Sequence, residues 1–164
     1  MKLGRIAAAA VISISIPFVG AAQPAEAANK HTARLQGTIN VYECCGFLGA
    51  ASDTQEREFD RTLRLAHGEH KWFKETECAG GEARGELTVN VRMVSDETLQ
   101  VWSVLNLWEG GSCGSLDRDG YQSGATRLLP SGTAQTWVLS AANDEWHSAD
   151  TTKAWFSVTH KVAP

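Results

Sequence analysis

The sequence predicts an all-β protein, an antiparallel β-sandwich of about seven strands stapled by disulfides. Three observations lead to this fold class. Apolar and polar residues alternate with a period of two through most of the chain after residue 34, as expected for strands with one buried face. These stretches are rich in aromatic and β-branched residues. Segments rich in Gly, Ser, Asn and Asp separate them at short intervals. A small closed β-barrel is the alternative architecture.

The expected strands follow one another along the chain. The clearest is 87–93, where Leu87, Val89, Val91 and Met93 alternate with polar residues. The pattern predicts seven strands at residues 35–42, 58–65, 70–78, 87–93, 99–107, 136–141 and 154–162. Turns are predicted at 46–53, 79–85, 95–97, 110–124, 130–132 and 143–150, and residues 50–58 could hold a helical turn.

Residues 1–27 have the features of a signal peptide. Lys2 and Arg5 make a basic start, residues 6–19 are mostly apolar, and Ala25-Glu26-Ala27 offers a small-x-small cleavage site. The apolar run is shorter than the roughly 20 residues that span a bilayer. We therefore expect cleavage after Ala27, residues 28–164 as a single secreted, extracellular β-sandwich domain, and no membrane span after cleavage.

Charge and cysteine content fit an exported protein. The chain of 164 residues has a formal net charge of −4, which argues against a nucleic-acid binder driven by positive charge. Its four cysteines, an even number, predict two disulfides. A bond between the neighbours Cys44 and Cys45 would be strained. We expect each of them to reach one of Cys78 and Cys113, in either of the two pairings.

The tryptophans are the leading candidates for a ligand-binding surface. Alternation places Trp102 and Trp108 opposite the apolar face of strand 99–107, and Trp155 opposite Phe156, while Trp146 lies in an acidic loop. Exposed indoles form flat apolar platforms on which sugar rings stack. The alternative is structural, because tryptophans also fill cross-strand pairs.

Two acidic loops make calcium a possible cofactor. Asp117 and Asp119 follow Glu109, and Asp144 belongs to a second loop over 143–150. If the two loops meet at one end of a sandwich, their oxygens provide the ligands that calcium prefers. The spacing is not that of an EF-hand, and such residues are also ordinary in turns.

Two weaker patterns point to catalysis or zinc. Residues 110–114 match the Gly-x-Ser-x-Gly pattern around Ser112, but the segment that follows reads as a loop rather than the helix such a hydrolase needs. His67 and His70 flank a turn and lack the usual zinc spacing. Catalytic residues are therefore not assigned.

These observations together predict a secreted, non-catalytic binding domain. The first hypothesis for its ligand is an extracellular carbohydrate or cell-envelope polymer, with calcium as a possible aid. The alternative is a protein partner, as for a protease inhibitor or a toxin-like effector, bound through the loop at residues 110–124. A small secreted hydrolase comes third.

Overall fold

The computed structural model describes residues 31–44, 52–143 and 149–162, and these ranges contain nine β-strands. In chain order they are β1 (His31–Glu43), β2 (Asp53–Leu65), β3 (His70–Ala79), β4 (Ala83–Ser95), β5 (Thr98–Glu109), β6 (Asp117–Ser123), β7 (Arg127–Pro130), β8 (Ala134–Ala142) and β9 (Thr151–Val162). The described residues include no helix, which confirms the predicted all-β class. Accordingly, none of them forms a helix that could cross a membrane.

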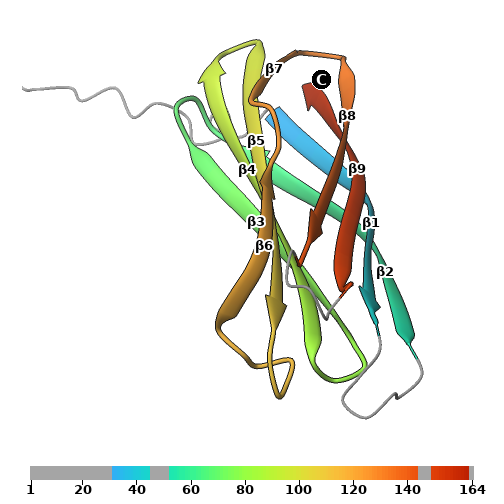
Figure 1. Ribbon diagram of the computed structural model, residues 1–164. Helices are drawn as coiled ribbons and strands as arrows, with labels where there is room; N and C mark the ends of the chain where they lie inside the picture. Colours follow the sequence, from blue (N-terminus) through green and yellow to red (C-terminus); the bar gives the residue numbers. More distant parts are fainter. Residues whose placement is uncertain (1–30, 45–51, 144–148, 163–164) are drawn as a thin grey trace, which may run out of the picture.

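The strands form two antiparallel sheets that face each other (Figure 1). Sheet A has the strand order β2-β1-β9-β8. Sheet B has the order β3-β4-β5, and both β6 and β7 pair with the remaining edge of β5, at different positions along it. No described strand pairs from one sheet to the other, so the predicted sandwich is confirmed and the closed barrel is not formed.

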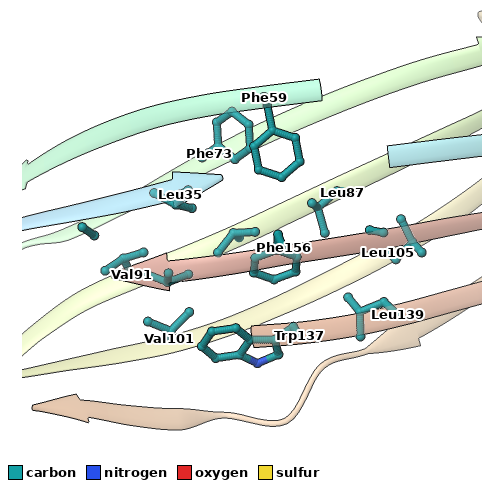
Figure 2. Packing of buried hydrophobic residues seen from close by; sticks show 14 of the residues in the cluster. Leu35, Phe59, Phe73, Leu87, Val91, Val101, Leu105, Trp137, Leu139 and Phe156 are labelled. Carbon is teal, nitrogen blue, oxygen red and sulfur yellow. The ribbon is translucent and has the colours of Figure 1, made fainter. Parts of the chain in front are cut away.

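The core lies between the sheets because alternation turns one face of each strand inward. Leu87, Val89, Val91 and Met93 of β4 are all fully buried. Across the interior, Figure 2 shows the core side chains of sheet A, including Trp137 and Phe156, which stack with ring centroids 5.4 Å apart. Because the inner face of each sheet is buried in the core, the two outer faces are the ones that a ligand can reach.

Two of the nine strands arise where the sequence predicted no strand. Strand β6 falls within the predicted loop at 110–124, and β7 follows it. Strand β6 has no buried residue and β7 has one, Leu129, so neither carries a strand-like alternation. Their backbones instead pair with the open edge of β5. Similarly, β2 begins at Asp53, so residues 53–58 are strand and the helical turn suggested for 50–58 is wrong there.

The predicted disulfide pairing is wrong. Cys78, near the end of β3, pairs with Cys113 in the β5–β6 connection, and their Cα atoms are 6.0 Å apart. Cys78 belongs to sheet B and Cys113 lies in the connection between two strands of that sheet, whereas Cys44 follows β1 in sheet A, so this bridge does not join the two sheets. Cys44 is likewise disulfide-bonded. Cys45 lies outside the described residues.

Candidate functional site

The predicted ligand-binding tryptophans lie on two opposite faces of the sandwich. Trp102 and Trp108 are on the outer face of sheet B, both partly exposed. Trp155 is on the outer face of sheet A, with 54% of its surface exposed. These three residues therefore cannot form one site. Trp146 lies outside the described residues.

An aromatic patch on the outer face of sheet B is built from three neighbouring strands. Trp72 of β3 pairs with Asn90 of β4, and Asn90 pairs with Trp102 of β5. The two indoles thus stand in one cross-strand row, about 10 Å apart at the backbone because each strand spacing is close to 5 Å. Trp72 is 61% exposed, more than any other described tryptophan.

His70 completes this patch. Its imidazole stacks on the ring of Trp102, with centroids 5.1 Å apart and planes inclined by 21°. Its Nε2 lies 3.1 Å from Oδ1 of Asn90, which sits between the two indoles. We call His70, Trp72, Asn90 and Trp102 the aromatic patch. It combines apolar ring surface with an amide and an imidazole that can exchange hydrogen bonds with a ligand.

Sequence reasoning placed Trp102 on this surface but passed over Trp72 and His70. Strand β3 contains Trp72 and Phe73 side by side among charged residues, so its alternation gave no clear face. The burial of Phe73 places Trp72 on the outside. Trp72 could have been found by aligning β3 with the clearly alternating β4, because paired residues of neighbouring strands lie on the same face of a sheet.

Cationic side chains border the patch on both sides. Lys74 follows Trp72 on the same face of β3 and forms a 3.1 Å ion pair with Glu86. Arg92 follows Asn90 on the same face of β4, is exposed and pairs in register with His70. Because Glu86 offsets the charge of Lys74, the exposed Arg92 is the main positive charge of this border.

Trp108 occupies a different environment at the other end of β5. The Arg84 guanidinium lies over its ring, 5.3 Å from the centroid. The same guanidinium donates hydrogen bonds to the carbonyl oxygens of Cys113 and Ser115, at 2.6 and 3.0 Å. Trp108 and Arg84 thus support the loop that carries the Cys78–Cys113 bridge, and one ring face of Trp108 is covered.

Three of the four predicted calcium ligands come together. Glu109, Asp117 and Asp119 line one depression of about 220 Å³, together with Glu82. Asn143 Nδ2 donates a hydrogen bond to Glu109 Oε2. Within the described ranges, no three His, Cys, Asp or Glu side chains have an arrangement that would hold a metal. Asp144 lies outside the described residues.

A buried carboxylate lies at the end of β1. Glu43 is 7% exposed, and among the described residues its Oε2 atom has no hydrogen-bond partner. Burial raises the pKa of this carboxyl group, and repulsion from Glu82, Asp150 and Asp53 raises it further. This end of the sandwich therefore concentrates negative charge.

The side chains of the two weaker patterns make separate contacts in the described residues. The Ser112 hydroxyl accepts a 3.3 Å hydrogen bond from the backbone of Gly114, and the segment leads into strand β6 rather than a helix. His67 and His70 have separate partners, because His67 Nδ1 lies 2.9 Å from Asp96 whereas His70 stacks on Trp102.

No known family model matches this chain, and no curated protein matches it in sequence.

Proposed function

We propose that this protein is a secreted, non-catalytic domain that binds a carbohydrate or cell-envelope polymer through the aromatic patch. The observation that carries the proposal is the cross-strand row in which Trp72 and Trp102 stand on either side of Asn90. Secretion rests on the leader-like residues 1–27.

The chemistry of a sugar chain suits this row. A pyranose ring presents apolar C–H groups on its faces and hydroxyls around its rim, so it stacks on an indole while its hydroxyls bind polar side chains. The two indoles are separated by about 10 Å, two strand spacings, which is close to the length of a disaccharide. Asn90 and His70 lie where the hydroxyls of a bound chain would pass.

The charged side chains at the border of the patch favour one kind of polymer over another. Arg92 is exposed and placed to attract acidic groups carried by a glycan, whereas the charge of Lys74 is already paired with Glu86. A polymer with uronic acid or phosphate groups should therefore bind more tightly than a neutral one at low salt, and the difference should shrink as salt screens the charges.

Affinity electrophoresis in gels containing polysaccharide tests the proposal. The gels contain polygalacturonate, a neutral β-glucan or soluble glycol-chitin. We expect the protein to be retarded by at least one polymer, and Trp72→Ala and Trp102→Ala each to weaken that binding about tenfold, as loss of ~1.4 kcal/mol would. Leu116→Ala is the matched control, because Leu116 is 83% exposed but lies outside the patch.

The same gels separate the alternatives. Running them with calcium and with chelator tests the depression at Glu109, Asp117 and Asp119. If chelator leaves the retention unchanged, calcium does not assist polymer binding. Migration unaffected by every polymer, with or without calcium, would refute glycan binding. It would favour a protein partner, for which Leu116 and Tyr121 offer exposed apolar side chains at 83% and 63%.

A further inference from the structure

The outer face of sheet A contains a second aromatic surface. Trp155 of β9 pairs with Thr38 of β1 on one side and with Val138 of β8 on the other. Both apolar side chains are open, Trp155 at 54% and Val138 at 69%. This surface faces away from sheet B, so it is separated from the aromatic patch by the whole thickness of the sandwich (Figure 1).

A depression of about 500 Å³ lies beside the indole of Trp155. It is lined by Gln36, Gly37, Thr38, Glu58, Phe59, Asp60 and Trp155. The polar groups therefore lie along one side of the ring, on β1 and β2. This arrangement places an apolar platform next to a row of hydrogen-bonding side chains.

Several of these polar groups are held in fixed orientations. Arg34 binds Asp60 with two hydrogen bonds, from Nε to Oδ1 at 3.1 Å and from Nη2 to Oδ2 at 2.6 Å. Gln36 Nε2 donates to the same carboxylate at 3.1 Å. The amide oxygen of Gln36 thereby has a defined direction before any ligand arrives, which lowers the ordering cost of binding.

We propose that this depression is a second sugar-binding site, with Trp155 as the stacking platform and the Gln36, Thr38 and Glu58 side chains as partners for hydroxyl groups. This inference rests on the proposed function for the class of ligand, but it concerns a different face and different residues. Two sites on opposite faces make the protein bivalent, so that one molecule joins two glycan chains.

The lining favours a sugar over a protein partner. Hydroxyl groups both donate and accept hydrogen bonds, and the depression offers donors and acceptors together around a single indole. Of the lining residues, Phe59 is only 5% exposed, so Trp155 supplies the exposed apolar surface, whereas a stable protein interface needs roughly 800 Å² per partner with an apolar centre. Glu58 and Asp60 also make this site less suited to acidic sugars than the aromatic patch.

The indole N–H resonances in a ¹⁵N-correlated NMR spectrum test the second site directly. The probes are hexamers of N-acetylglucosamine and of β-linked glucose, added to the protein and to its Trp72→Ala/Trp102→Ala double variant. We expect the Trp155 resonance to move in both proteins and with the same midpoint, because the two faces act independently. Trp155→Phe identifies the resonance.

The outcomes distinguish this inference from the proposed function. If the Trp72 and Trp102 resonances move with either probe while Trp155 stays still, the second site is refuted and the proposed function stands. If Trp155 alone moves, the second site stands and the aromatic patch does not bind these neutral sugars. Stationary resonances for all three residues with both probes refute the second site, while the polygalacturonate gels still test the aromatic patch.

Bivalency has its own measurement. Beads coated with N-acetylglucosamine hexamers or with glucose hexamers should agglutinate when the wild-type protein is added. Trp155→Ala should still bind the beads without agglutinating them, while Leu116→Ala, which changes an exposed side chain outside both sites, should behave like the wild type. Agglutination by Trp155→Ala at wild-type concentrations would show that this face is not a binding site.

Discussion

Among single residues, the described tryptophans differ in what covers them. Trp137 is in the core, where its Nε1 donates to the carbonyl of Ala125 at 2.9 Å. Trp108 is covered by Arg84. Trp72 and Trp155 have more than half of their surface open to solvent. Burying an indole contributes stability, whereas an exposed indole contributes little. We therefore expect Trp72 and Trp155, which lie on opposite faces, to contact ligands.

Glu43 provides a test at this scale, through its raised pKa. The folded state disfavours the charged form, so Glu43 favours folding below its ordinary pKa of 4.5 and loses that contribution as the pH rises through the folded-state value. Replacing Glu43 with Gln removes the buried charge and keeps the shape. We expect Glu43→Gln to raise the urea midpoint at pH 7, with a difference that shrinks towards pH 4.

The matched control is Glu58→Gln, which removes an exposed carboxylate. Its urea midpoint should stay close to that of the wild type at both pH values. A Glu43→Gln variant no more stable than the wild type at pH 7 would contradict the account of Glu43 as a destabilising buried charge.

At the scale of elements, the outer edge of sheet B is shared by two short strands. Strand β6 pairs with residues 104–109 of β5, and β7 pairs with residues 98–101. Beside this edge, Arg127 of β7 donates a hydrogen bond to the carbonyl of Thr136 on β8 of sheet A at 3.0 Å. This edge is thus covered by local pairing and side chains, which protects it from pairing with another molecule.

Gly37 shows how closely β1 and β9 approach each other. It pairs with Phe59 on one side and Phe156 on the other. A Cβ atom at this position would lie 2.2 Å from the backbone oxygen of Trp155. We expect Gly37→Ala to lower the free energy of unfolding by about 1–3 kcal/mol, measured by urea denaturation, because the backbone must shift to make room.

Gly111→Ala is the control for this substitution, since a Cβ atom there would meet nothing within 4 Å. It should change the free energy of unfolding far less. A Gly37→Ala variant as stable as the wild type would mean that β1 and β9 can separate at little cost, contrary to the packing described.

At the scale of the whole molecule, His160 joins the two sheets. It is fully buried on β9 of sheet A, and its Nδ1 lies 3.1 Å from the carbonyl oxygen of Leu129 on β7 of sheet B. Its Nε2 lies 3.2 Å from Nδ1 of His31 on β1. Burial is the main cause that lowers the pKa of His160, and the charge of His31 lowers it further.

This arrangement predicts a loss of stability in acid. The neutral form of His160 is favoured in the folded state, so its contribution is complete above the ordinary pKa of 6.5 and is lost as the pH falls through the folded-state value. We expect the free energy of unfolding to fall between pH 7 and pH 5. In His160→Gln, which cannot gain a charge, the fall should be smaller, and an equal fall in both proteins would argue against this role.

The candidate site was only partly predictable from the sequence. Alternation placed Trp102 and Trp155 on outer faces, since the phase of β5 and β9 is fixed by their buried neighbours. It could not show that these faces point in opposite directions, because that depends on which sheet each strand joins. Trp72 and His70 meet Trp102 only through the pairing of β3, β4 and β5.

The sequence by itself determined the all-β class and most core positions, because a period of two must bury one face of each strand. Tertiary structure alone decided strand order, the Cys78–Cys113 bridge and the separation of Trp102 from Trp155. These features depend on contacts between residues far apart in the chain, and local alternation carries no information about which strand edges pair. Strands β6 and β7 also depend on such contacts, because both pair with the open edge of β5.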